Sequence, residues 1–323
     1  MVSVLITGGA GFIAPNLISR LLKRGDTVLA VDNLCRGTLS NLTEPLEHPR
    51  FAFAKVDLTD LGAYRSCLDG HTGIGPITEV WHLAANSDIP AGIADSSIDL
   101  RDTFMTTFNT LKVMAERGVR RILFASSSAI YGDLGERELT EDIGPLFPIS
   151  NYGAMKLASE AAITAAVESF LESALLFRFP NVVGVPATHG VILDFILRLR
   201  DQPAFLEVLG DGTQQKAYLH VSDLVDAMLT IQARATRAKV SAFNIGSTDD
   251  GVTVRRIAEE TVAVVAPQAE LRFGTGNRGW VGDVPRFRYS TAKLQALGWR
   301  PSLDSMGAVR RAIREIAAQG RPR

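Results

Sequence analysis

The stretch Thr7-Gly8-Gly9-Ala10-Gly11-Phe12-Ile13 decides the fold of this chain. It follows a short apolar run, VSVLIT, and precedes a segment from 12 to 24 with the apolar spacing of a helix. Glycines between a strand and a helix let the backbone turn tightly and bring helix N-terminal amides against a pyrophosphate. The spacing Gly8-x-x-Gly11-x-x-Ala14 departs from the commoner G-x-G-x-x-G, because its last position carries a methyl group. A plain strand-to-helix turn is the alternative interpretation.

An acidic residue follows at the position that a dinucleotide site requires. The second apolar run, TVLAVD, ends in Asp32, about 20 residues after the glycine loop. A carboxylate there can accept hydrogen bonds from both hydroxyls of an adenosine ribose, and it repels a 2′-phosphate. Arg36 could soften that repulsion and admit NADP, but Asp32 favours NAD. Asp57, after the third apolar run, could accept from the adenine amino group or cap the following helix.

The first half of the chain alternates apolar runs with amphipathic stretches. The runs are VSVLIT, TVLAVD, FAFAKVDL, EVWHLAA and RILFASSS. Stretches such as 28–31 and 122–125 are apolar at every position, as in parallel strands that helices cover on both faces. This rhythm predicts an α/β fold with a Rossmann-type, doubly wound parallel sheet.

Beyond about residue 180 the rhythm breaks up. The patterns predict helices at 191–201, 222–235 and 253–265, with strands at YLHV and SAFNIG. These elements are too few for a second complete sheet, so we expect a smaller, interleaved C-terminal lobe that binds substrate. The predicted domains are an NAD-binding domain at 1–180, with a returning segment at about 215–248, and a lobe formed by 181–214 and 249–323.

Composition excludes several classes of function. The chain has 323 residues, of which 46% are hydrophobic, and a formal net charge of −1. It can therefore bury a large core, but it lacks the basic excess that nucleic acid or an anionic membrane requires. Two cysteines are too few for a disulfide framework or a thiolate metal site, and no cluster has metal-ligand spacing. No apolar run approaches the roughly 20 residues of a membrane span, so we expect a cytoplasmic protein without a metal.

A serine, a tyrosine and a lysine have the spacing of a catalytic set. Tyr152 and Lys156 stand four residues apart at the start of a predicted helix, so they share one face. A nearby ammonium stabilises phenolate, and we expect it to lower the pKa of Tyr152 from about 10 toward neutrality. The run Ser126-Ser127-Ser128 ends a strand, on the carboxyl edge where open α/β sheets bind ligands. Without that run, such a Tyr and Lys pair would indicate an ordinary surface feature.

The motifs together resemble the extended short-chain dehydrogenase/reductase family, and within it the nucleotide-sugar 4-epimerases of the UDP-galactose 4-epimerase type. They occur in family order over nearly the whole chain: TGGAGFI, Asp32, HLAA (82–85), ASSSAIYG (125–132), YGAMK (152–156), RFPNVVG (178–184) and GDGTQQKAYLHVSD. The family's catalytic Ser or Thr stands four residues before the Tyr of its YG pair, which selects Ser127 here. Tyr152 and Lys156 match the family's base and its ribose-binding lysine.

The resemblance implies two sets of binding residues. The expected cofactor contacts are Gly8, Gly11, Phe12, Ile13, Asp32, Asn33, Asp57, Leu58, Leu83, Ala84, Ala85, Tyr152 and Lys156. The expected substrate contacts are Ser87, Ser127, Ser128, Asn181, His189, Val191, Lys216 and Arg278.

The resemblance also implies a reaction, in which C4 of a nucleotide-diphosphate sugar is inverted through a transient 4-keto sugar and NAD is retained. Tyr152 would take the proton from the 4-hydroxyl, Ser127 would hold that hydroxyl in line, and Lys156 would bind the nicotinamide ribose. Relatives that eliminate water or carbon dioxide carry acids near the catalytic Ser or Thr, where this chain has Ser128 and Ala129. A dehydratase, decarboxylase or 4-ketoreductase stays the alternative, and a catalytically silent NAD-sensing scaffold is a third interpretation.

Several positions keep two interpretations. Lys216 stands where many epimerases have arginine, which keeps the charge but loses the bidentate fork. Arg278 is either a diphosphate-binding arginine or an ordinary surface residue, and His189 either contacts substrate or caps a helix. Thr103 stands where the family usually has Asn, and His82 is expected to be a packed core histidine. Relatives pair the helices near 99–117 and 152–170 in a dimer, so we expect a homodimer; the base and the sugar stay open.

Overall fold

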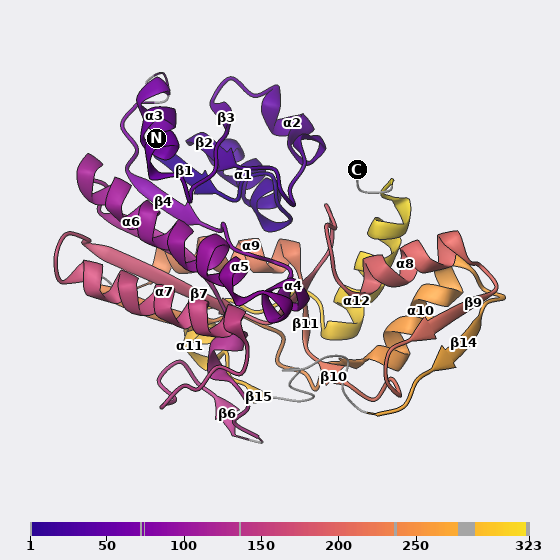
Figure 1. Ribbon diagram of the computed structural model, residues 1–323. Coiled ribbons are helices and arrows are strands. Elements are labelled where there is room, and N and C mark those ends of the chain that lie inside the picture. The colour runs from indigo at the N-terminus through magenta and orange to yellow at the C-terminus, as the bar shows by residue number, and fades with distance from the viewer. Residues whose placement is uncertain are drawn as a thin grey trace. The chain divides into compact units, whose positions relative to one another are not determined.

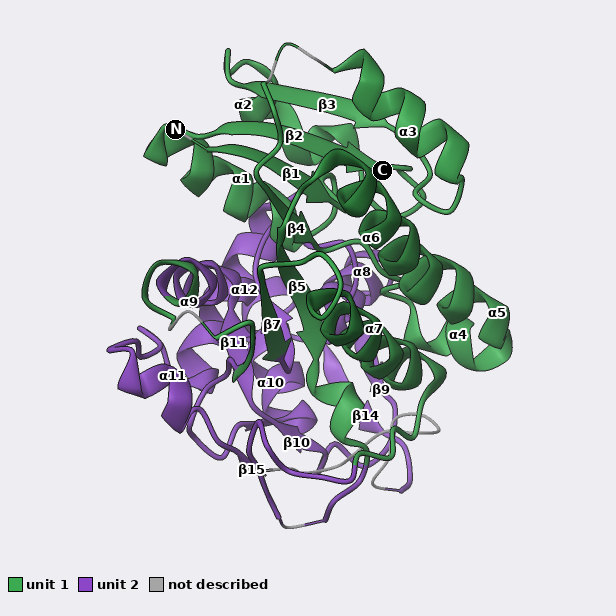
Figure 2. Cartoon of the chain, turned by 90° about the vertical axis from the view of Figure 1, so that its left-hand side faces the viewer, with its two compact units in different colours: residues 1–132, 146–178, 231–243 green, residues 133–145, 179–230, 244–323 purple. Residues whose placement is uncertain are grey.

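The computed structural model describes residues 2–71, 73, 75–135, 137–235, 238–276 and 288–320 (Figure 1). The chain divides into two compact units, which are described separately. Unit 1 comprises 1–132, 146–178 and 231–243, and unit 2 comprises 133–145, 179–230 and 244–323 (Figure 2).

Unit 1 contains a seven-stranded sheet in the order β12-β7-β5-β4-β1-β2-β3. The strands are β1 (Ser3–Thr7), β2 (Thr27–Asp32), β3 (Phe51–Lys55), β4 (Glu79–His82), β5 (Arg121–Ser127), β7 (Ser173–Phe179) and β12 (Val240–Asn244). Neighbouring strands from β3 to β5 pair in parallel. The apolar runs form these strands because a parallel sheet covered on both faces buries every side chain, as at 28–31, where all four residues have no exposed surface.

Helices cover both faces of this sheet. Helix α1 (Ile13–Arg24) lies on one face, and α3 (Leu61–Gly70), α6 (Thr106–Arg117) and α7 (Asn151–Val167) lie on the other (Figure 2). An apolar core that includes Leu29, Tyr64 and Ile163 joins the second group of helices to the sheet. The predicted Rossmann-type fold is therefore confirmed. The remaining α-helices in the described part of this unit are short, namely α2 (Thr43–Leu46), α4 (Ile89–Ala94) and α5 (Ser96–Asp99). The 3-10 turns Leu39–Leu42 and Ser128–Tyr131 precede α2 and follow β5, respectively, and a π-helical segment, Leu100–Met105, joins α5 to α6.

Unit 2 holds four two-stranded sheets in its described residues. The strand pairs are β6 (Glu138–Leu139) with β15 (Arg288–Tyr289), β8 (Asn181–Val183) with β11 (Tyr218–His220), β9 (Phe205–Val208) with β14 (Glu270–Phe273), and β10 (Gln215–Lys216) with β13 (Val252–Thr253). The helices are α8 (Val191–Asp201), α9 (Val221–Arg234), α10 (Val254–Val265), α11 (Ala292–Ala296) and α12 (Ser305–Ala318). Residues 231–234, the end of α9, belong to unit 1. Helices α8, α10 and α12 share an apolar core around Ile196, Ile257 and Ile313.

The units differ from the predicted domain boundaries in two places. The segment that returns to unit 1 is 231–243 rather than 215–248, because β11 pairs with β8 inside unit 2 instead of joining the large sheet. Residues 133–145 also belong to unit 2, where β6 pairs with β15. Both differences arise from pairings between distant segments, which local patterns do not record.

The described residues offer neither a membrane-spanning helix nor a metal cluster. No helix in the described ranges is both long and apolar enough to cross a bilayer. In the same ranges no group of three or more His, Cys, Asp or Glu could hold a metal ion. Cys35 and Cys67 are free thiols, the first exposed and the second partly buried.

Candidate active site

The glycine loop between β1 and α1 packs closely against the strands beside it. Gly8 has a φ of +68°, and a Cβ there would lie 2.9 Å from the amide nitrogen of Ala84. A Cβ on Gly9 would lie 2.6 Å from the Ala30 Cβ, so this position also excludes a side chain. The Gly9 amide donates to the Val31 carbonyl at 3.0 Å and the Gly11 amide to the Gly8 carbonyl at 3.2 Å. The glycines therefore let the loop pack tightly against β2 and the backbone after β4 and turn into α1, whose N-terminal amides favour an anion such as a pyrophosphate.

The departure at Ala14 does not disturb this loop. Ala14 is buried, and α1 runs without a break from Ile13 to Arg24. Pro15 is the third helical residue, and the first four amides of a helix have no intrahelical acceptor, so Pro15 breaks no bond. The methyl group packs where the commoner pattern has hydrogen.

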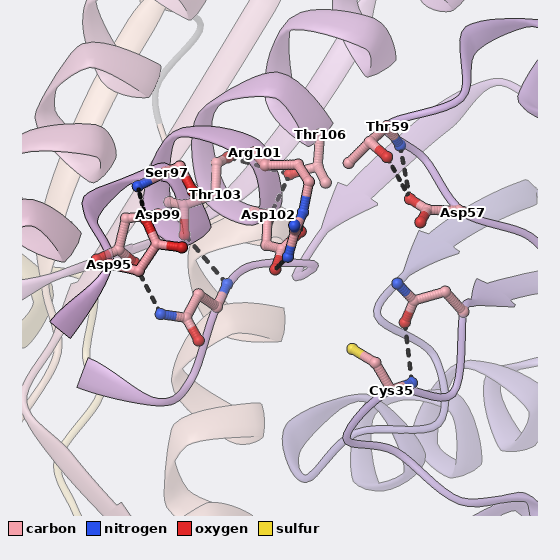
Figure 3. A network of polar contacts seen from close by, with 12 residues as sticks. Cys35, Asp57, Thr59, Asp95, Ser97, Asp99, Arg101, Asp102, Thr103 and Thr106 are labelled. Atoms are coloured by element: carbon pink, nitrogen blue, oxygen red, sulfur yellow. Dashed lines mark hydrogen bonds and ion pairs between the residues drawn. The ribbon is translucent and has the colours of Figure 1, made fainter. Parts of the chain in front are cut away.

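Asp32 connects the end of β2 to the glycine loop. Its Oδ2 accepts from the Ala10 amide at 3.0 Å and its Oδ1 from the Leu34 amide at 2.7 Å. Burial raises the pKa of this carboxyl, which is 9% exposed, and the two amide hydrogen bonds oppose that rise. Each oxygen keeps a lone pair for a further donor, so the carboxylate fits an adenosine ribose. Asn33 fixes the following turn by accepting from the Cys35 amide at 3.0 Å (Figure 3).

Arg36, which could have admitted a 2′-phosphate, has an acidic partner. One of its guanidinium nitrogens lies 3.1 Å from a carboxylate oxygen of Asp88. Both side chains are partly exposed, so the pair is weak. The pairing still offsets the positive charge near Asp32, in keeping with NAD rather than NADP.

Replacing Asp32 by Asn tests this cofactor preference. We expect NAD affinity to fall about tenfold, because hydrogen bonds to a charged acceptor contribute about 1.5–3 kcal/mol. NADP affinity should rise, because the repulsion of its 2′-phosphate is removed. Equilibrium dialysis against each labelled cofactor measures both, with Asp60→Asn as the control, since Asp60 only caps α3. An unchanged NAD to NADP preference in Asp32→Asn would contradict the role assigned to this acid.

Asp57 does not cap the following helix. The N-cap of α3 is Asp60, which accepts from the Ala63 amide at 2.9 Å, so that alternative for Asp57 is wrong. One Asp57 oxygen instead accepts from the amide and the hydroxyl of Thr59, at 2.9 and 2.8 Å (Figure 3). The carbonyl of the neighbouring Leu58 accepts from Asn109 at 2.8 Å. These contacts hold the loop after β3 at the same sheet edge as Asp32.

A buried histidine organises the end of β4. The Nδ1 of His82 lies 2.7 Å from the Thr7 hydroxyl, and its Nε2 lies 3.0 Å from the Thr107 hydroxyl. The Thr7 hydroxyl accepts from the Leu83 and Ala84 amides, each at 3.1 Å. Burial lowers the pKa of His82 to about 3, so the ring is neutral. His82 is a core residue, as predicted, and it holds the backbone of 83–85 beside the glycine loop.

Ser127, Tyr152 and Lys156 come together at the carboxyl end of β5. The Ser127 side chain hydrogen bonds to Tyr152, and its Oγ also accepts from the Ala129 amide at 3.1 Å. Lys156 Nζ donates to the Ala125 carbonyl at 2.6 Å and lies 5.8 Å from the centre of the Tyr152 ring. The approach of α7 depends on Gly153, because a Cβ there would lie 2.4 Å from the Ala129 carbonyl oxygen. The predicted set is therefore assembled by β5 and the first turns of α7.

The ionisation of this set differs from the expectation. Burial raises the pKa of Tyr152 to about 12, against a smaller lowering by its hydrogen bond to Ser127, so the predicted fall toward neutrality is wrong for the chain by itself. Burial also lowers the pKa of Lys156 to about 7, and the carboxylates of Glu160 and Asp99 oppose that shift. Desolvation disfavours both charged forms, and the spacing of Tyr and Lys does not reveal it.

The expected substrate residues of unit 2 that the structure describes lie near β8 and β10 and at the start of α8. Asn181 in β8 donates from Nδ2 to the Ala217 carbonyl at 3.3 Å, which places it beside Lys216 in β10. The cap of α8 is Gly190 and not His189, so the helix-capping alternative for that histidine is wrong. The ring of His189 is exposed and contacts the Thr188 hydroxyl, and Val191 opens α8. Arg278 lies outside the described residues.

Two buried carboxylates near Lys156 were not predicted. Asp99, at the end of α5, is 1% exposed and accepts from the Asn86 side chain at 2.9 Å (Figure 3). Glu160 lies one turn after Lys156 on α7 and is 4% exposed. The second has a sequence signal, since it is an acid in an otherwise apolar stretch of helix. Ser87, partly exposed in the turn after Asn86, and Ser128, which opens the turn after β5, complete the residues expected at this edge.

Comparisons with known proteins agree with this geometry. Residues 4–246 match the model of the NAD dependent epimerase/dehydratase family. A putative UDP-glucose 4-epimerase of Methanocaldococcus jannaschii is 26% identical over 315 residues, which is 96% of this chain and 97% of that protein.

Two solved structures are similar over almost their whole length. The crystal structure of a UDP-galactose 4-epimerase is 34% identical, with a TM-score of 0.85 over 98% of this chain and 99% of that one. The UDP-glucose 4-epimerase of Thermus thermophilus in complex with NAD is 27% identical, with a TM-score of 0.83 over 98% of this chain and 99% of that one. The chain belongs to the NAD-dependent epimerase/dehydratase family of extended short-chain dehydrogenases/reductases and is an NAD-dependent enzyme.

Proposed function

We propose that this chain interconverts the C4 epimers of a nucleotide-diphosphate sugar and keeps its NAD bound through each turnover. The observation that carries the proposal is the contact between Ser127 and Tyr152 at the carboxyl edge of the seven-stranded sheet. Lys156 lies beside this pair. A silent NAD-binding scaffold would have no use for this set.

The residues divide the reaction between them. Tyr152, as phenolate, accepts the proton of the sugar 4-hydroxyl, and Ser127 holds that hydroxyl in line through its contact with Tyr152. The ammonium of Lys156 stabilises the phenolate. Bound NAD supplies the acceptor, and then the donor, of the C4 hydride. The 4-keto sugar then rotates, so that its other face receives the hydride. Tyr152 returns its proton to the oxygen at C4, so atoms and electrons balance without an external reductant.

The cofactor contacts follow the edge of the sheet. The loop residues Gly8, Gly11, Phe12 and Ile13 would hold the pyrophosphate, since they connect the end of β1 to the first residue of α1, where helix amides attract an anion. The adenosine would contact Asp32, Asn33, Asp57 and Leu58. The backbone of Leu83, Ala84 and Ala85 lies next to the loop through Thr7 and would complete the site.

The nearest positions to Ser127 favour epimerisation over elimination. Removal of water or carbon dioxide needs an additional proton donor or acceptor beside the reacting carbon. Ser128 and Ala129 supply none that titrates near neutral pH. A dehydratase or decarboxylase reaction is therefore the alternative that an assay of the reaction products must exclude.

On the substrate side we propose a UDP-sugar, because the similar structures are described as epimerases of such sugars. Asn181, which donates to the carbonyl of Ala217, and Lys216, the residue before Ala217, would donate to the diphosphate. Lys216 would act as a single point charge rather than a bidentate fork. Ser87, Ser128, His189 and Val191 are further proposed contacts, as is Arg278.

A substrate panel tests the function. Purified protein is incubated with UDP-, GDP-, ADP- and dTDP-sugars without added cofactor, and NMR follows the configuration at C4. We expect C4 inversion of at least one UDP-sugar, with the equilibrium reached from both epimers. Loss of water or carbon dioxide would establish the alternative reactions, and no change in any sugar would contradict the proposal.

We also propose a homodimer formed through α6 and α7. Phe108 on α6 is 43% exposed and stacks on Phe104 with 6.3 Å between ring centres. A single chain therefore exposes apolar surface at this position, which a second copy could bury. Phe108→Glu should therefore give a monomer by analytical ultracentrifugation, since a buried charge opposes association. Leu46→Glu is the control, because that residue is similarly exposed on α2 and should leave the dimer intact. A monomeric wild-type chain would contradict the proposal.

For the location of the protein we propose the cytoplasm. The exposed thiol of Cys35 and the partly buried thiol of Cys67 are both free, which suits a reducing compartment. Nucleotide sugars carry two phosphate charges and do not cross a bilayer unaided. Fractionation of cells that express the tagged protein tests this location. Recovery of the protein in the fraction of an oxidising compartment would contradict the proposal.

A further inference from the structure

A buried ion pair lies behind the proposed catalytic set and takes no part in the proposed proton and hydride transfers. Arg178 in β7 donates from Nε to Glu160 Oε1 at 2.9 Å and from Nη2 to Oε2 at 2.6 Å. Glu160 is 4% exposed and Arg178 is 7% exposed. The free energy that is needed to remove the two charges from water offsets most of their mutual attraction. A buried ion pair is therefore weak evidence of a role in stability.

The pair holds both ends of the segment that carries Ser127. Ser126 donates from Oγ to Glu160 Oε1 at 2.5 Å, and Arg178 donates from Nη1 to the Tyr131 hydroxyl at 3.0 Å. Ser126 immediately precedes Ser127, and Tyr131 ends the turn that follows it. The position of Ser127 relative to α7 is therefore fixed by hydrogen bonds to one carboxylate and one guanidinium.

The same carboxylate acts on Lys156. Glu160 follows Lys156 by one turn of α7, and its charge favours the ammonium form against the effect of burial. The other ionisable groups that act on this ammonium are Asp99 from α5, which also favours it, and His82 from β4, which is neutral. Tyr152 faces it from the preceding turn. A lysine whose pKa is about 7 loses its charge near neutral pH, so a small change in these charges changes the fraction that is protonated.

We propose that Glu160, oriented by Arg178, is a positioning residue of the epimerisation, which fixes the segment from Ser126 to Tyr131 and keeps Lys156 charged. The inference rests on the proposed function. Two effects can be separated, because Ser126 and Tyr131 affect only the position of Ser127, whereas Glu160 affects both that position and the charge of Lys156.

Three variants distinguish these effects on the NAD-loaded enzyme. Glu160→Gln should lower kcat about tenfold at neutral pH with little change in KM, and should move the alkaline fall of kcat about one pH unit lower. The direction follows because the ammonium is the active form and Glu160 stabilises it. Ser126→Ala and Tyr131→Phe should each lower kcat severalfold and leave the alkaline fall at its original pH. Glu116→Gln is the matched control, since Glu116 forms a bidentate pair with Arg65 at the surface and should change nothing.

A second measurement does not depend on turnover. In protein with ¹³C-labelled lysine, the Cε shift of Lys156, assigned by Lys156→Arg, should titrate about one pH unit lower in Glu160→Gln than in the wild type or Ser126→Ala. If Glu160→Gln does not fold, the double variant Glu160→Gln with Arg178→Gln also removes the buried guanidinium charge and should give the same lowered titration. An unchanged Lys156 titration together with wild-type kcat at every pH would overturn the inference. A wild-type chain that epimerises no sugar while the titration shifts would overturn only the proposed function.

Discussion

Tyr152→Phe is expected to lower kcat for C4 inversion about a thousandfold, because removal of a general base typically costs between about 10² and 10⁴ in rate. The hydroxyl group is the only part of the side chain that is lost, so the ring should still pack beside Ser127 and Lys156. We expect the amount of bound NAD and the melting temperature to stay near those of the wild type. Initial rates by NMR, with the NAD content of the denatured protein, measure all three quantities.

Tyr64→Phe is the control for this variant. Tyr64 is fully buried in the core between the sheet and its helices, so the change also removes one buried phenol oxygen, but away from the proposed site. Its kcat should equal that of the wild type. Full turnover by Tyr152→Phe would show that the proton transfer does not pass through this residue.

Gly8→Ala is expected to abolish cofactor retention. The residue has a φ of +68°, and the new Cβ would lie 2.9 Å from the Ala84 amide nitrogen. The left-handed conformation alone costs roughly 1–2 kcal/mol for a residue with a Cβ. The close contact adds to that cost and must displace the loop or the backbone after β4. The purified variant should therefore contain less than about a tenth of the wild-type NAD, since a displaced loop that loses about 1.4 kcal/mol of binding free energy loses a factor of ten in affinity.

Gly118→Ala separates strain from close contact. Gly118 ends α6 with a φ of +67°, almost the value at Gly8, and a Cβ added there would meet no atom within 4 Å. This control should lose stability through backbone strain but retain its NAD. If Gly8→Ala retained the cofactor as fully as Gly118→Ala, the loop would not be the pyrophosphate site.

The large sheet could be predicted from the sequence because its signals are local. Each strand of a covered parallel sheet is an apolar run, and the run TVLAVD became β2 with the same bounds. Helix α8 also has the predicted bounds, 191–201, because its apolar residues recur at helical spacing. The position of Asp32 at the end of β2 followed from the same pattern.

Pairings between distant segments could not be predicted. The strand around Leu219 was expected near the first domain, but its partner is β8, where Asn181 pairs with Tyr218. The pair of Glu160 and Arg178 belongs to the same class, since a helix and a strand bring them together. Neither residue carries a local signal that names its partner.

The ionisation of the site depends on burial, which the sequence does not give. The spacing of Tyr152 and Lys156 predicted a tyrosine with a lowered pKa, but desolvation raises it to about 12. The same desolvation lowers the pKa of Lys156 to about 7. Two buried carboxylates, Asp99 and Glu160, oppose that change, and their effect is visible only once the fold has placed them.

The fate of the hydrogen at C4 tests the central claim most directly. UDP-galactose is converted by the enzyme in D₂O without added NAD, and proton NMR measures both the epimer formed and the isotope at C4. Because the hydride leaves and returns within one active site, the product should have inverted C4 and should retain protium there. Deuterium at C4, or an absolute requirement for added NAD or NADH, would contradict the claim that bound NAD carries the hydride while Ser127, Tyr152 and Lys156 act on the sugar hydroxyl.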